Sequence, residues 1–72
     1  MKSYSTLYHE RLADQILHLT PDGEVDIKKP WPFNDPEHAR RWVLTMANRN
    51  GINKKIFTSV LNDSHVKVRR VA

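Results

Sequence analysis

Eight positively charged side chains fall between positions 40 and 70 of this 72-residue chain, and they are the residues best suited to bind another molecule. They are Arg40, Arg41, Arg49, Lys54, Lys55, Lys67, Arg69 and Arg70. Guanidinium and ammonium groups bind phosphates and carboxylates through charge-assisted hydrogen bonds. We take these eight as candidate binding residues. Arg69 and Arg70 are expected to contact phosphates in preference to base edges.

The charges are divided unevenly along the chain. Residues 1–36 contain four bases and six acids, a net charge of −2, whereas residues 37–72 contain eight bases and two acids, a net charge of +6. This division predicts a polarised surface with one face that suits a polyanion. It requires the eight cations to share one outer face of the folded domain. The alternative is a set of scattered cations that only keep the protein soluble.

Two tryptophans are the aromatic candidates for stacking on a base. Trp31 lies in the segment Lys28-Lys29-Pro30-Trp31-Pro32-Phe33, beside two lysines and two prolines, and we include it among the candidate binding residues. Trp42 lies in the middle of an apolar helical stripe, so its predicted role is in the core.

No constellation of residues indicates catalysis or metal binding. The chain has no cysteine, which excludes a disulfide, a thiol nucleophile and cysteine zinc sites. No two of its four histidines have the spacing of three or four that pairs metal ligands on a helix. Ser59 and Ser64 near His65 do not make a triad, because a chain this short can scarcely build an oriented base and an oxyanion pocket. We expect no enzyme activity, no metal and no cofactor.

The element predicted from the most independent signals is a helix over residues 36–50. Asn34 or Asp35 provides the N-cap, Pro36 suits the first turn, and Asn50-Gly51 provides a left-handed stop. The apolar stripe of this helix consists of Ala39, Trp42, Val43, Met46 and Ala47.

Residues 52–61 and 65–71 are predicted as a basic C-terminal hairpin around the turn at 62–64. Val66 and Val68 then face the core, which leaves His65, Lys67, Arg69 and Val71 on the other face. The last strand is a possible exposed edge, where a second copy of the chain could pair.

The first half is predicted to contain a short helix over residues 5–17, capped by Ser5 or Thr6, and a first hairpin. The hairpin arms are residues 16–19 and 24–27, joined by the turn Thr20-Pro21-Asp22-Gly23 with Gly23 in the left-handed conformation. Trp31 and Phe33 fold back from the proline-rich connector onto the core. Residues 1–33 hold the N-terminal elements and the connector, and residues 34–72 hold the central helix and the basic hairpin.

These elements predict one small α+β domain over residues 1–72, because a chain of this length hides only one core. Two β-hairpins, four strands in all, surround one central amphipathic helix, with an additional short N-terminal helix possible. Size, absence of cysteine and the basic hairpin resemble small accessory proteins of bacteriophages and mobile elements. No apolar stretch is long enough to span a membrane, no secretion signal is visible, and the expected location is the cytoplasm.

The charge pattern predicts a small basic, non-enzymatic protein that binds nucleic acid in a regulatory or architectural role. Contacts mainly to backbone phosphates are expected, with DNA favoured over RNA as the partner. The alternative is a protein-interaction module that binds an acidic surface of a larger nucleic-acid-processing enzyme, such as a polymerase or nuclease, and regulates or inhibits it.

Overall fold

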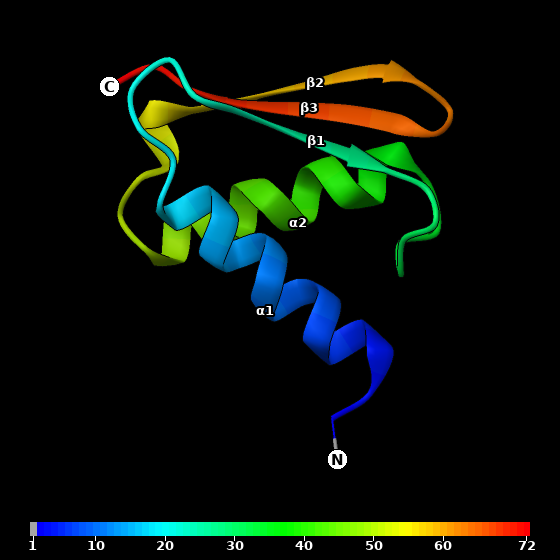
Figure 1. Cartoon of the computed structure of the whole chain (residues 1–72). Helices are drawn as coiled ribbons and strands as arrows, with labels where there is room; N and C mark the ends of the chain where they lie inside the picture. The colour runs from blue at the N-terminus through cyan, green and yellow to red at the C-terminus, as the bar shows by residue number, and fades with distance from the viewer. Residues whose placement is uncertain (1) are drawn as a thin grey trace.

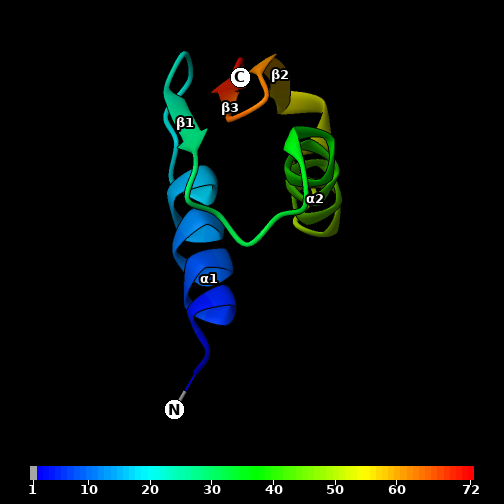
Figure 2. The same ribbon diagram turned by 90° about the vertical axis from the view of Figure 1, so that its right-hand side faces the viewer.

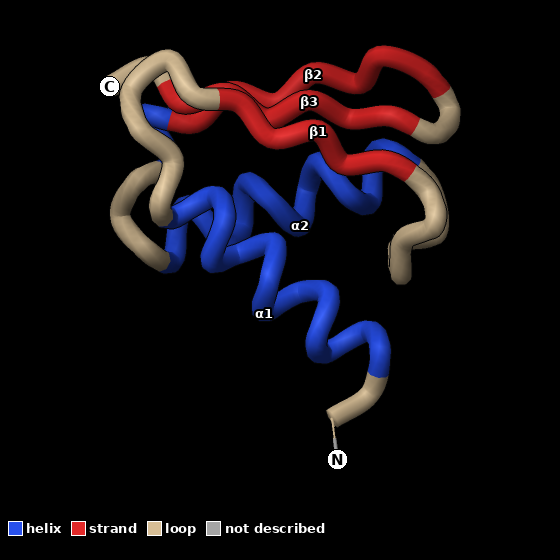
Figure 3. Tube along the Cα trace, viewed as in Figure 1, coloured by secondary structure: helices blue, strands red, loops and turns tan. Residues whose placement is uncertain are grey.

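The computed structural model describes residues 2–72, which form two helices packed on one face of a three-stranded antiparallel sheet (Figures 1 and 3). The elements in chain order are α1 (Tyr4–Leu17), β1 (Glu24–Lys28), α2 (Pro36–Arg49), the short 3₁₀ helix η1 (Asn53–Lys55), β2 (Ile56–Asn62) and β3 (His65–Arg70). The strand order in the sheet is β1-β3-β2. Along residues 2–72, no helix has the length and apolar character needed to cross a membrane.

Helix α1 forms where the apolar side chains recur at helical spacing. Leu12 and Ile16 are buried, and Tyr8 packs partly against the core on the same stripe. The N-cap is Ser3, whose hydroxyl accepts from the backbone N–H of Thr6, so the prediction that Ser5 or Thr6 caps the helix is wrong. Both of those residues lie inside the helix, which begins at Tyr4, one residue before the predicted start.

The predicted N-terminal hairpin is wrong. The helix continues through Leu17, so residues 16–19 do not form a strand, and β1 pairs with β3 instead. The register places Val25 opposite Val68 and Ile27 opposite Val66. This pairing buries Ile27, Val66 and Val68 in the core and packs Val25 against it. Ile16 is buried in the same core as part of α1.

The turn between α1 and β1 exists, although its residues have different roles from those predicted. Asp22 has the positive φ of 69°, whereas no positive φ occurs at Gly23. Gly23 is required for space, because a Cβ there would lie 2.8 Å from the backbone oxygen of Thr20. Aspartate tolerates the left-handed conformation better than most residues.

Helix α2 confirms the predicted central helix and its ends. Asp35 caps it by accepting from the backbone N–H of His38 at 2.7 Å, Pro36 is in the first turn, and Gly51 after the helix has a φ of 72°. Its buried residues are Ala39, Val43, Met46 and Ala47. Trp42 packs against this core, as predicted, but it lies at the margin of the stripe and is only partly buried.

The C-terminal hairpin is confirmed, with a shorter first strand. Residues 53–55 form η1, so β2 begins at Ile56 and not at residue 52. Val66 and Val68 on β3 are fully buried, as predicted. However, β3 lies between β1 and β2, so the last strand is the centre of the sheet and the prediction that it is a free edge is wrong.

The core lies between the sheet and the two helices. In the view of Figure 2, α1 lies beneath β1 and α2 lies beneath β2. Phe33 from the connector completes the core and contacts Tyr8, Trp42 and Trp31 through tilted or edge-to-face rings. The described residues therefore form one small α+β domain with three strands and two helices, instead of four strands around one helix. The opposite face of the sheet is uncovered.

Candidate binding surface

Two of the eight candidate cations, Lys67 and Arg69, lie on the uncovered face of the sheet and are paired with carboxylates. Lys67 Nζ lies 3.4 Å from Glu24 Oε2, and Arg69 Nη2 lies 3.2 Å from Asp22 Oδ1. Such exposed pairs contribute at most about 1 kcal/mol each. They nevertheless place a negative charge beside each positive one, which weakens the attraction of this face for a polyanion.

A third pair on the same face joins Asp26 and His65. His65 Nε2 lies 3.1 Å from Asp26 Oδ1, at ion-pair distance but outside good hydrogen-bond geometry. The pKa of Asp26 is lowered below its usual value, principally by this polar contact with His65 and further by the charges of His65, Lys67 and Lys28. On this face, therefore, the carboxylates of Asp22, Glu24 and Asp26 lie against the basic side chains of β3.

Arg70 has a structural position. Its Nη1 donates to the backbone oxygen of Leu19 at 2.9 Å, and its Nε donates to the backbone oxygen of Ala72 at 2.7 Å. The side chain lies at the level where α1 leads into the turn before β1, and it is partly buried. Its guanidinium is committed to backbone carbonyls of the chain itself.

Arg40 on α2 is also paired. Its guanidinium forms a bidentate contact with Glu37, one turn earlier, with hydrogen bonds of 2.6–3.2 Å. Arg40 lowers the pKa of Glu37 through these hydrogen bonds and its charge, and Glu37 in turn raises the pKa of Arg40. Arg40 is therefore partly neutralised.

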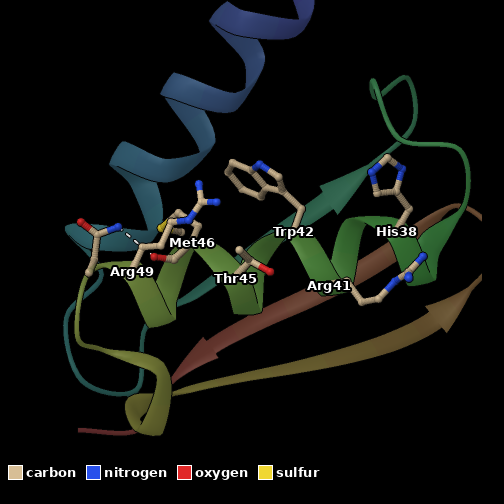
Figure 4. A pocket seen from close by; sticks show the side chains of 7 residues that line it. His38, Arg41, Trp42, Thr45, Met46 and Arg49 are labelled. Atoms are coloured by element: carbon tan, nitrogen blue, oxygen red, sulfur yellow. Dashed lines mark hydrogen bonds between the residues drawn. The ribbon is translucent and has the colours of Figure 1, made fainter.

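Arg41 and Arg49 line a shallow pocket on the exposed side of α2 (Figure 4). The remaining lining residues are His38, Trp42, Thr45, Met46 and Asn50, and no carboxylate is among them. Neither arginine has a carboxylate within 4.0 Å in the described part of the chain. They are eight positions apart, about 12 Å along the helix axis. The lining of the pocket therefore contains two cations and one indole.

Lys54 and Lys55 extend this group beyond the C-terminal end of α2. Both are exposed on η1, which packs against α2, and neither has an ion-pair partner within residues 2–72. The negative end of the helix dipole at Arg49 also attracts cations. We call Arg41, Arg49, Lys54 and Lys55 the α2 cations.

The aromatic residue in this pocket is Trp42 and not Trp31. Trp42 stacks on His9 of α1, with ring centroids 4.9 Å apart and an interplanar angle of 22°, and Figure 4 shows its indole on the side of α2 that faces α1. Trp31 is partly buried beside Phe33, and its Nε1 is buried without a hydrogen-bond partner. Sequence reasoning placed Trp42 in the core because it lies between fully apolar stripe positions. On a helical projection Trp42 lies at the edge of this stripe, and that was the sequence signal for its partial exposure.

The eight cations consequently do not form one surface. Lys67 and Arg69 lie on the uncovered face of the sheet, whereas the α2 cations lie in the helical layer and at its end. Four of the eight have no carboxylate partner within residues 2–72 and lie along α2 and η1: Arg41 and Arg49 line the pocket, and Lys54 and Lys55 follow the C-terminal end of α2. His38 and Thr45, which sequence reasoning did not select, line the same pocket.

The chemistry available at the α2 cations is electrostatic binding with stacking. Fixed positive charges beside a partly exposed indole can hold an anion that carries a flat apolar group. Within residues 2–72, no group of three or more histidine, aspartate or glutamate side chains is placed to hold a metal ion.

No protein-family model matches the chain, and no curated protein or solved structure matches it either.

Proposed function

We propose that this chain is a small non-enzymatic protein that binds nucleic acid, mainly through backbone phosphates, in a regulatory or architectural role. The observation that supports this most is the pocket on α2, whose lining includes Arg41, Trp42 and Arg49 and no carboxylate. Phosphates supply the anions that the arginines need, and bases supply flat rings that pack on an indole.

The α2 cations are the proposed contacts, and they replace the broader set of eight. Arg41 and Arg49 bind phosphates along α2. Lys54 and Lys55, beyond the C-terminal end of α2, contact further phosphates of the nucleic acid. Arg40, Lys67 and Arg69 contribute less, because each has a carboxylate within 3.4 Å. DNA is the proposed partner ahead of RNA.

The second candidate is docking onto an acidic surface of a larger nucleic-acid-processing enzyme. It is favoured by the small size of the free cationic group, since four unpaired side chains suit a limited protein patch as well as a long phosphate tract.

Titration of the purified chain with labelled duplex DNA, single-stranded DNA and RNA at two salt concentrations tests the proposal. Binding at low salt that weakens steeply at higher salt is the expected result, because phosphate contacts release counterions. Absence of binding to all three at low salt would reject nucleic acid and leave the enzyme-docking candidate.

A further inference from the structure

Strand β2 forms one edge of the sheet and is open to solvent along its outer side. Its only partner within residues 2–72 is β3, and it is the longest strand. None of its seven residues is charged. Phe57, Val60 and Leu61 are 60%, 45% and 50% exposed, which is half of the large exposed hydrophobic side chains of the described chain.

The backbone groups on this edge can be assigned from one hydrogen bond. The N–H of Val71 donates to the oxygen of Lys55 at 2.9 Å, so the polar groups of Lys55 face β3. In an antiparallel ladder the groups of successive residues point to alternate sides. Phe57 and Ser59 therefore face β3, and the N–H and C=O groups of Ile56, Thr58 and Val60 point outward without a strand to pair with.

The opposite edge of the same sheet is protected in the usual way. On β1 the exposed residues Glu24, Asp26 and Lys28 are all charged, and Pro30 follows the strand. Charges and prolines at an edge prevent pairing with another strand. Strand β2 has neither, and its pairing with β3 is regular from Ile56 to Val60, before the irregularity between Val60 and Asn62. The two edges of one small sheet therefore differ in the charges and prolines that prevent strand addition.

A second copy of the chain is a poor fit for this edge. In a twofold antiparallel pairing, the two β2 strands would lie about 4.8 Å apart, whereas packed helices need about 8–10 Å. Figure 2 shows α2 beneath β2 and displaced outward past it, so the two α2 helices would overlap. A single extended segment has no such helix and can lie beside β2 above α2.

We propose that the β2 edge binds an extended, uncharged segment of a partner protein by strand addition. Backbone hydrogen bonds to Ile56, Thr58 and Val60 give the affinity, and neighbouring side chains of the segment, which point to opposite faces, meet Phe57 on the outer face and Val60 on the helical face. This interaction uses backbone groups of β2 and not the side chains of the α2 cations, of which Lys55 directly precedes the strand, and it does not depend on nucleic-acid binding.

Nuclear magnetic resonance of the intact chain tests the proposal with a defined probe. The probe is a short synthetic peptide in which valine and threonine alternate between terminal lysines, and the control peptide has proline at its centre. We expect the alternating peptide to slow amide hydrogen exchange at Ile56, Thr58 and Val60, and the proline peptide to leave it unchanged. Protection on β1, or none at either edge, would overturn the proposal.

Two variants keep the test independent of folding. Thr58→Pro removes an outward N–H that β3 does not use, and an edge strand tolerates proline there. Val60→Lys adds a charge to the edge. Each is expected to weaken peptide binding at least tenfold while Lys28→Ala on β1 leaves it unchanged. Equal binding by Val60→Lys and the unaltered chain, or self-association of the unaltered chain that Val60→Lys abolishes, would contradict the proposed occupant.

Discussion

Arg70 donates a hydrogen bond from Nη1 to the backbone oxygen of Leu19 at 2.9 Å. This contact joins the end of the central strand β3 to the segment that follows α1. The two residues are 51 positions apart, so the contact holds together two segments that are distant in the chain. Sequence reasoning placed Arg70 among the binding residues, whereas the structure commits it to the chain's own backbone.

Arg70→Ala is therefore expected to destabilise the domain by about 1.5–3 kcal/mol, the usual range for a hydrogen bond to a charged group. Urea denaturation followed by circular dichroism measures the change. Lys54→Ala, an exposed cation without an ion-pair partner within residues 2–72, is the matched control and should stay within about 0.5 kcal/mol. Equal stability of the two variants would show that the Leu19 contact contributes nothing.

The contact between Asp26 and His65 predicts a stability change in acid. The pKa of Asp26 is lower in the folded chain than its unfolded value of about 3.9, so its stabilising contribution is present above that value and is lost as the pH falls through the folded pKa. Urea denaturation between neutral pH and strongly acidic pH should show this loss. Asp26→Asn should be less stable at neutral pH and should approach the unaltered chain below the folded pKa; parallel profiles would contradict the assignment.

Ile16 distinguishes the helix found here from the predicted hairpin arm. The side chain is fully buried in the core, so Ile16→Ala is expected to cost about 2–5 kcal/mol, as much as a small domain can spare. The adjacent Gln15, exposed on α1, is the control, and Gln15→Ala should leave the unfolding midpoint nearly unchanged because alanine favours helix. Equal unfolding midpoints for the two variants would contradict the burial of Ile16 on the inner face of α1.

Local signals predicted the second half of the fold well. Asp35, Pro36 and Gly51 fix the ends of α2 by short-range hydrogen bonds and backbone preference, and the alternation of Val66 and Val68 identifies β3. The first half failed because pairing is not local. The turn at residues 20–23 suggested a hairpin, but β1 reaches a strand more than 35 residues later, where its valine, isoleucine and carboxylates all find matching partners.

The candidate site could be predicted only in part for a related reason. The sequence shows which residues are cations but does not show which of them meet carboxylates across the sheet. Lys67 and Arg69 meet Glu24 and Asp22, which are distant in the chain. Only the pairing of Arg40 with Glu37, at a spacing of three on one helix, was within reach of local reasoning.

The most direct test of the proposed function compares two double variants in duplex DNA binding over a range of salt concentrations. Arg41→Ala with Arg49→Ala removes two proposed phosphate contacts, so the log–log salt slope should fall by about 1.8, at about 0.9 for each contact, and binding should weaken. Lys67→Ala with Arg69→Ala removes the same charge from the ion-paired face of the sheet and should change the slope much less. A larger loss of slope in the Lys67 and Arg69 variant, or no loss in the Arg41 and Arg49 variant, would contradict binding through α2.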